Sequence, residues 1–145
     1  MSDMYGKGDK GKATKLHSIL IRSLGYCESC FRECTCDDKW KHTQGCFLQA
    51  AHIQGRKASA TRTLLRNAFC MCASEHGIFT DKPLTFSRFV TTTWAQEYRE
   101  ELIQLSNTMT KVNWTDRYAE LKEIEKQMRA GMTLAEARAN ESTTG

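Results

Sequence analysis

The chain has 145 residues and a single proline, and 40% of its residues are hydrophobic, which is enough for one modest core but hardly for two. No run approaches the ~20 apolar residues of a membrane span, and the N-terminus lacks the apolar centre of a secretory signal. We therefore expect no membrane contact and a cytoplasmic location. Seven cysteines in such a chain favour metal ligands and free thiols over disulfides.

Charge is spread unevenly along the chain. Residues 1–70 hold 12 Lys or Arg against 6 Asp or Glu, whereas residues 71–145 hold 9 against 11. The basic half indicates a surface that binds a polyanion, with ordinary solubility charge as the alternative. Residues 1–12 interleave glycine with lysine, which predicts a flexible basic arm that either lies along phosphates or has no role.

A short amphipathic helix is predicted from Ala13 to about Leu24, and Gly25 is placed to end it. Its apolar residues recur at helical spacing: Leu16, Ile19, Leu20 and Leu24. His17 lies beside this stripe, so we expect it on the surface.

The first cysteines follow that helix. Cys27 and Cys30 form a C-x2-C pair, the spacing at which a tight turn aims two thiolates at one Zn²⁺ ion. A polar loop follows and carries four further possible ligands: Cys34, Cys36, His42 and Cys46. These four could form a second zinc cluster, but their spacing, C-x-C-x5-H-x3-C, matches no standard site well. We interpret the segment as an inserted loop with reduced thiols.

A strand, loop, strand, helix order is predicted next. Residues 47–53 have the length and flanks of a strand with His52 near its end, and residues 67–71 can form the return strand. Ser74 and Glu75 then have the character of a helix start. The loop between the strands holds four cations and no acid, which favours phosphate contact over a merely solvated loop: Arg56, Lys57, Arg62 and Arg66.

The second half of the chain is helical in pattern. We predict helices over residues 84–106, 114–130 and 133–139, with aromatic stripes that pack in a core instead of stacking on bases. Pro83 is placed to begin the long helix and to mark a boundary. The resulting division is a flexible arm (1–12), a zinc-bearing core (13–82), a helical extension packed on the core (83–139) and a disordered tail (140–145).

Together these motifs carry a resemblance to a known family. The C-x2-C pair precedes four short segments in order, namely Ala51-His52-Ile53, Leu65-Arg66-Asn67, Cys72 through His76, and Phe79-Thr80-Asp81. Over residues 27–89 the chain resembles the HNH endonucleases, particularly the small phage-type members. The resemblance implies an α+β, predominantly helical fold: a zinc-stabilised ββα-metal core followed by C-terminal helices.

The resemblance also implies a function and three site residues. The function is metal-dependent hydrolysis of phosphodiester bonds in DNA. His52 would be the general base, His76 would bind a catalytic divalent cation such as Mg²⁺, Mn²⁺ or Ni²⁺, and Asn67 would hold the segment that bears His52. The basic loop between the strands would contact DNA phosphates.

A structural zinc ion is implied at Cys27, Cys30 and Cys72, and this chain departs from the family at two positions. Glu75 stands where the family has a further cysteine, so the fourth ligand is Glu75, or Cys70 or Cys46 in its place. Ala51 stands where many of these nucleases have Asp or His beside the base.

These departures keep two alternatives open. The first is a non-catalytic, zinc-stabilised module that binds DNA with strong salt dependence and does not cut it. The second is a protein partner that docks on the C-terminal helices, for instance within a phage replication or packaging assembly in the host cytoplasm.

Overall fold

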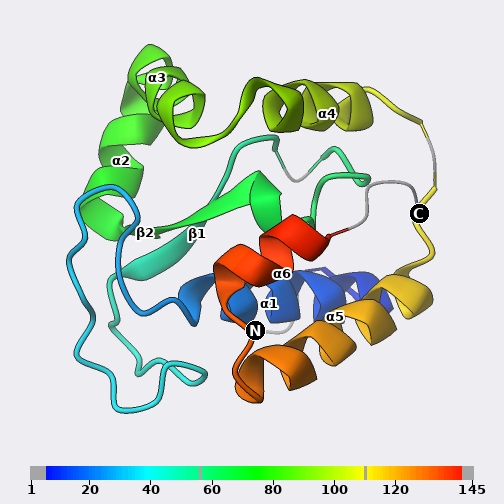
Figure 1. Cartoon of the computed structure of the whole chain (residues 1–145), viewed down its shortest axis with the longest axis horizontal. Coiled ribbons are helices and arrows are strands. Elements are labelled where there is room, and N and C mark those ends of the chain that lie inside the picture. Colours follow the sequence, from blue (N-terminus) through cyan, green and yellow to red (C-terminus); the bar gives the residue numbers. More distant parts are fainter. Residues whose placement is uncertain (1–5, 56, 110, 142–145) are drawn as a thin grey trace.

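The structure, a computed structural model, describes residues 6–55, 57–109 and 111–141. It confirms an α+β, mostly helical protein with one two-stranded antiparallel sheet. Its elements are α1 (Gly8–Arg22), β1 (Leu48–His52), β2 (Ala68–Cys72), α2 (Ala73–Asp81), α3 (Pro83–Thr93), α4 (Gln96–Ser106), α5 (Trp114–Arg129) and α6 (Leu134–Asn140). The hairpin lies between α3 and α4 on one side and α1 and α5 on the other (Figure 1). Among the described residues no helix is both long and apolar enough to cross a membrane.

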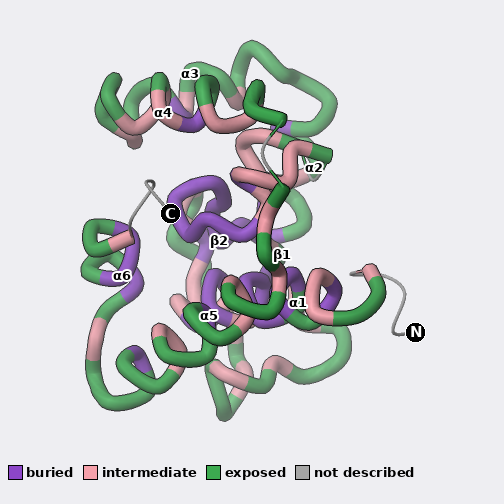
Figure 2. Tube along the Cα trace, turned by 90° about the vertical axis from the view of Figure 1, so that its right-hand side faces the viewer, coloured by how far each residue is buried: buried purple, intermediate pink, exposed green. Residues whose placement is uncertain are grey.

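The hairpin occupies the centre of the molecule. β1 and β2 pair in antiparallel register from Leu48 opposite Cys72 to His52 opposite Ala68. Every residue of β2 is buried, as its unbroken apolar sequence requires (Figure 2). Because α2 begins directly after Cys72, the strands and the following helix occur in the predicted order.

Helix α1 packs against the hairpin and lies alongside α5. Leu20 and Ile21 are fully buried there with Leu121 of α5. The expectation that His17 lies on the surface is wrong, because its side chain is fully buried. Its ring Nε2 donates a hydrogen bond to the backbone oxygen of Leu64 at 2.9 Å, so the buried polar ring is anchored by a segment distant in the sequence.

The long helix predicted over residues 84–106 is two helices. Helix α3 ends at Thr93, and Trp94 has an extended backbone with φ −102° and ψ 138°. The indole of Trp94 stacks on Phe69 of β2 with ring centroids 5.0 Å apart, and its Nε1 donates to the backbone oxygen of Arg66 at 2.9 Å. Packing on the buried strand therefore overrides a helical pattern that three consecutive threonines, residues 91–93, already weaken.

Parts of both ends that were expected to be flexible have a defined structure. Helix α1 begins at Gly8 instead of Ala13, so residues 8–12 are not an arm. At the other end α6 reaches Asn140, and the side chain of Glu141 is only 1% exposed and accepts a hydrogen bond from the backbone N–H of Leu65 at 2.7 Å. Residues 1–5 and 142–145, which also belong to those predictions, lie outside the described residues.

Candidate active site and metal centres

The two histidines of the predicted triplet line one cavity. His52 is the last residue of β1, and His76 lies in the first turn of α2. The cavity has a volume of about 220 Å³, and its lining residues come from β1, α2 and α3 and from the residue after β1: Ala51, His52, Ile53, His76, Phe79, Thr80 and Phe86. The fold thus brings together two imidazoles that belong to separate elements of the chain.

The tautomer of His52 follows from its contact with the backbone. Its Nε2 lies 3.1 Å from the backbone oxygen of Arg62. A carbonyl oxygen only accepts hydrogen bonds, so Nε2 carries a proton. In the neutral ring Nδ1 therefore carries the lone pair, which is the state a general base requires.

His76 has the opposite arrangement. Its Nδ1 donates a hydrogen bond to Oε1 of Gln49 on β1, which puts the lone pair of the neutral ring on Nε2, the nitrogen that would bind a metal ion. Among the described residues, however, no group of three ligating side chains includes His76. Ala51, which lines the same cavity, offers only a methyl group. A cation at His76 would therefore depend on phosphate oxygens and water for most of its coordination.

Asn67 fixes the loop that follows His52. Its buried side chain accepts a hydrogen bond at Oδ1 from the backbone N–H of Gln54 at 2.8 Å. Its Nδ2 donates to the backbone oxygens of Thr61 at 2.9 Å and of Gln54 at 3.1 Å. The backbone oxygen of Asn67 also accepts from the N–H of Ile53 at 2.7 Å. These bonds connect the segment after β1 to the segment that contains Arg62, whose backbone oxygen contacts His52.

The four predicted phosphate-binding residues divide into different environments. Lys57 is exposed, and Arg62 is half-buried. The prediction for Arg66 is wrong, because its side chain is 4% exposed and pairs with Glu101 of α4 at 2.9 Å. Arg56 lies outside the described residues. Phosphate contact from this loop therefore reduces to Lys57 and Arg62 among the described cations.

Three cysteines form the first metal-binding arrangement, named here the three-cysteine cluster: Cys27, Cys30 and Cys72. Their sulfur atoms all lie within 4.8 Å of one another, and the sulfurs of Cys30 and Cys72 are 3.8 Å apart. A tetrahedral Zn²⁺ with Zn–S bonds of about 2.3 Å holds two sulfurs at about 3.8 Å, so the geometry fits zinc. Backbone N–H groups of Cys30 and Glu75 lie 3.5 Å from the sulfurs of Cys27 and Cys72, as they do around bound thiolates.

None of the proposed fourth ligands belongs to this cluster. The carboxylate of Glu75 accepts a hydrogen bond from the hydroxyl of Ser29 at 2.8 Å, which places Glu75 beside the C-x2-C turn but outside the group of clustered ligand atoms. Cys70 is buried in β2, and burial raises the pKa of its thiol to about 12. Burial therefore disfavours the thiolate form that a metal ion requires. Cys46 belongs to a different group.

That different group is named here the loop cluster: Cys34, Cys36, His42 and Cys46. We interpreted these residues as reduced thiols in an inserted loop, yet their ligand atoms lie within 4.8 Å of one another, so they could hold a metal ion such as zinc. The hydroxyl and the backbone N–H of Thr43 hydrogen-bond to the sulfur of Cys36, and these contacts lower the pKa of that thiol to about 6. The sequence signal was the crowding of four possible ligands into one loop, although their spacing was irregular.

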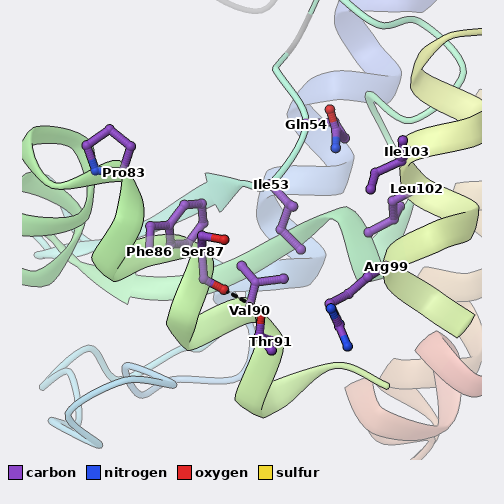
Figure 3. A pocket seen from close by; sticks show the side chains of 10 residues that line it. All are labelled: Ile53, Gln54, Pro83, Phe86, Ser87, Val90, Thr91, Arg99, Leu102 and Ile103. Carbon is purple, nitrogen blue, oxygen red and sulfur yellow. Dashed lines mark hydrogen bonds between the residues drawn. The ribbon is translucent and has the colours of Figure 1, made fainter. Parts of the chain in front are cut away.

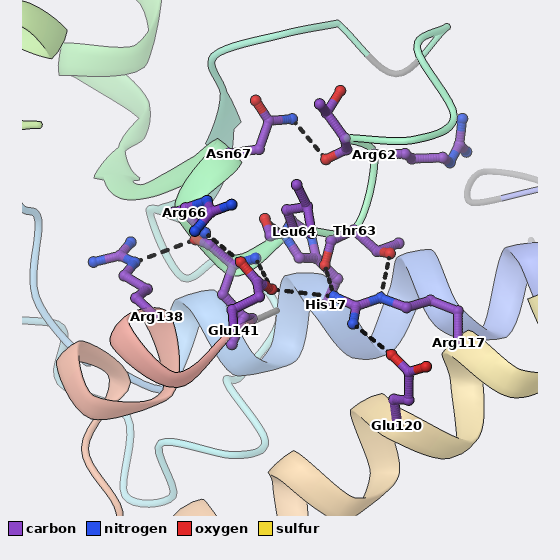
Figure 4. A network of polar contacts seen from close by, with 12 residues as sticks. His17, Arg62, Thr63, Leu64, Arg66, Asn67, Arg117, Glu120, Arg138 and Glu141 are labelled. Atoms are coloured by element: carbon purple, nitrogen blue, oxygen red, sulfur yellow. Dashed lines mark hydrogen bonds and ion pairs between the residues drawn. The ribbon is translucent and has the colours of Figure 1, made fainter. Parts of the chain in front are cut away.

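Sequence reasoning missed a buried ionic network that ties the C-terminus to the sheet. Arg138 of α6 donates to both carboxylate oxygens of Glu28, at 2.7 and 3.0 Å, and to the backbone oxygen of Ala68 at 2.8 Å. Glu28 lies inside the C-x2-C pair. Nearby, Arg117 of α5 pairs with the buried carboxylate of Glu141 at 3.2 Å (Figure 4). Charged residues at such separations in the sequence leave no periodic pattern that would predict their pairing.

A second cavity adjoins the histidine cavity. It has a volume of about 270 Å³ and shares Ile53 and Phe86 with the first. Side chains of α3 and α4 face one another across it, with Arg99 on the α4 side (Figure 3). The recess beside His52 thus continues between the two helices that cover the hairpin.

Comparison with models of protein families, with curated proteins and with solved structures found no match for this chain. The chain is a small α+β protein with two separate cysteine-containing clusters, each of which could hold a metal such as zinc.

Proposed function

We propose that the protein is a metal-dependent endonuclease of the HNH type that hydrolyses phosphodiester bonds in DNA. The observation that carries the proposal is the cavity that His52 and His76 share at the junction of β1 and α2. Contacts with the protein leave the lone pair on Nδ1 of the neutral His52 ring and on Nε2 of the neutral His76 ring, so the two imidazoles suit two different tasks.

His52 acts as the general base. Its Nδ1 takes a proton from a water molecule that attacks the phosphorus, while Nε2–H stays bonded to the backbone oxygen of Arg62 and stabilises the imidazolium. Asn67 is a positioning residue, because its side chain hydrogen-bonds both to the segment that follows His52 and to the segment that contains Arg62.

A divalent cation bound through Nε2 of His76 would stabilise negative charge on the phosphate and on the leaving oxygen. Imidazole suits Ni²⁺ better than Mg²⁺, so binding through His76 should favour Ni²⁺ over Mg²⁺. Lys57 and Arg62 lie in the loop that follows His52, where they would hold the flanking phosphates.

The test is nicking of supercoiled plasmid with Mg²⁺, Mn²⁺ or Ni²⁺. His52→Asn removes the imidazole base, so cleavage should fall about 10²- to 10⁴-fold, the usual contribution of a general base. Zinc content and circular dichroism should match wild type. Gln127→Ala, on an exposed part of α5, is the control and should cleave normally. Equal cleavage by His52→Asn and wild type would reject the proposal.

A non-catalytic DNA-binding module is the second candidate. Two observations favour it: no group of three ligating side chains among the described residues includes His76, and Ala51 offers the cavity only a methyl group. It predicts binding without cleavage in any of the three metals. Each lost phosphate contact should make the slope of log K against log salt concentration shallower by about 0.9. A change of this size in Lys57→Ala would show that Lys57 contacts a phosphate, whereas an unchanged slope would indicate that it does not.

A protein partner would find exposed apolar side chains on α3 and α4, at Leu84 and Ile103.

A further inference from the structure

We propose that the loop cluster binds a zinc ion of its own, held by the sulfurs of Cys34, Cys36 and Cys46 and by Nδ1 of His42. This ion is distinct from the one at the three-cysteine cluster, and the proposal does not depend on nuclease activity.

The distances within the loop cluster fit a tetrahedral zinc site. Nδ1 of His42 lies 3.6 Å from the sulfur of Cys34 and 3.4 Å from the sulfur of Cys46. Zinc bonds of about 2.3 Å to sulfur and about 2.0 Å to nitrogen, at tetrahedral angles, separate sulfur and nitrogen by about 3.5 Å. Three thiolates and one imidazole complete four-coordination, which is the closed arrangement of a structural site.

The orientation of His42 is an independent argument. Its Nε2 lies 2.8 Å from the backbone oxygen of Arg22, the last residue of α1. Because that oxygen only accepts, Nε2 carries the proton and Nδ1 of the neutral ring presents its lone pair to the sulfurs. Zinc-binding histidines characteristically donate their second ring N–H to a carbonyl or carboxylate in this way.

The loop has only partial packing to hold its shape, because Cys34, Trp40 and Cys46 are partly buried against the core. Residues between Cys34 and Cys46 are exposed or half-buried, so they form no core of their own. Their backbone bonds include short-range ones such as Lys41 to Asp38 and Cys46 to Thr43, at 3.1 Å each. A metal ion that binds four ligands from this one loop would supply the folding free energy that such a segment lacks.

The position of the site suggests what the ion would do. Its ligands are tied to the end of α1 through His42 and lead directly into β1 through Cys46. Zinc at the loop cluster would therefore hold the start of β1, the strand that ends at His52, against the C-terminal end of α1. We expect its loss to loosen this entry to β1 while the buried centre of the hairpin stays folded.

The test begins with the zinc content of the purified full chain, measured by native mass spectrometry and elemental analysis. His42→Ala and Cys46→Ser should each contain one zinc ion fewer than wild type, whereas Cys70→Ala, which alters a thiol outside both clusters, should match wild type. Cobalt loaded in place of zinc should give intense tetrahedral bands that weaken in His42→Ala. Wild-type zinc content in both loop variants would overturn the proposal.

Alkylation of the unmutated protein tests the same site without risk of misfolding. Trypsin separates the cysteines of the two clusters, because residues 33–39 and 42–56 contain only loop-cluster cysteines. Both peptides should be protected from N-ethylmaleimide until a chelator is added. Equal labelling of Cys34, Cys36 and Cys46 with and without chelator would overturn the proposal. Plasmid nicking plays no part in either measurement, so failure of this inference and failure of the proposed function are distinguishable.

Discussion

The two cysteine clusters use similar ligands in opposite structural settings. The three-cysteine cluster joins a turn that precedes the hairpin to the end of β2, and two of its members, Cys27 and Cys72, are buried. The loop cluster draws all its ligands from the single segment between α1 and β1, and none of them is buried. The first therefore cross-links elements that already share a core, whereas the second shapes a loop that is only partly packed against that core.

The two settings differ in how much a bound metal ion would contribute to the stability of the whole fold. Around the three-cysteine cluster, the ion would add to hydrophobic packing and to the Glu28–Arg138 pair, so its loss should disturb the whole fold. Around the loop cluster the effect should stay local, because all four ligands come from one loop.

The largest effect should follow removal of all metal by a strong chelator. Structural zinc commonly contributes about 10–16 kcal/mol, which is comparable to or larger than the ~5–15 kcal/mol net stability of a domain. The first half of the chain should unfold, with loss of helical circular dichroism and of the cooperative thermal transition. Added zinc should restore both. An unchanged melting curve after chelation would show that neither cluster stabilises the fold.

Arg138→Ala should have the next largest effect on stability. It leaves the largely buried Glu28 beside the three-cysteine cluster without its partner, and breaking such a pair typically costs about 3–5 kcal/mol. Urea unfolding measures the loss. Arg88→Ala, at an exposed position of α3, is the matched control and should change stability by less than about 0.5 kcal/mol. Similar values for the two variants would mean that the network does not support the cluster.

His42→Ala should destabilise the loop far more than the rest of the chain. Trypsin should cut after Lys39 and Lys41 roughly tenfold faster than in wild type, since local opening of the loop becomes easier. The midpoint of global unfolding should move much less than it does for Cys27→Ser. If His42→Ala lowered global stability as much as Cys27→Ser does, the two clusters would not differ as the fold indicates.

The smallest effect concerns His17, a buried histidine bonded like His42 to a backbone carbonyl but belonging to neither cluster. Burial, with the nearby charge of His52, lowers the pKa of His17 well below its usual value. Because the folded form holds this ring neutral, stability should be fully present above pH ~6.5, the pKa expected in the unfolded chain, and should fall as pH drops below it. His17→Gln should flatten the dependence of unfolding free energy on pH between about 7.5 and about 6.0. An unchanged slope would assign the acid sensitivity to the metal ligands.

Local sequence patterns predicted much of the fold. The ranges 114–130 and 133–139 correspond closely to α5 and α6, and the strands lie within a residue of the ranges predicted for them. Each of these elements has a periodic apolar pattern or a capping residue, such as Thr133, whose hydroxyl accepts from the backbone N–H of Glu136. The break at Trp94 has only a weak local signal, the threonines at 91–93, because it depends mainly on the ring of Phe69 from a distant strand.

The order of strand, strand and helix, and with it the α+β class, follows from short-range spacing, as does the C-x2-C pair. The burial of His17 and Arg66, the cavity shared by His52 and His76, and the loop cluster emerge from the folded chain alone. Each of these features depends on contacts between side chains and backbone groups whose spacing along the chain follows no fixed period.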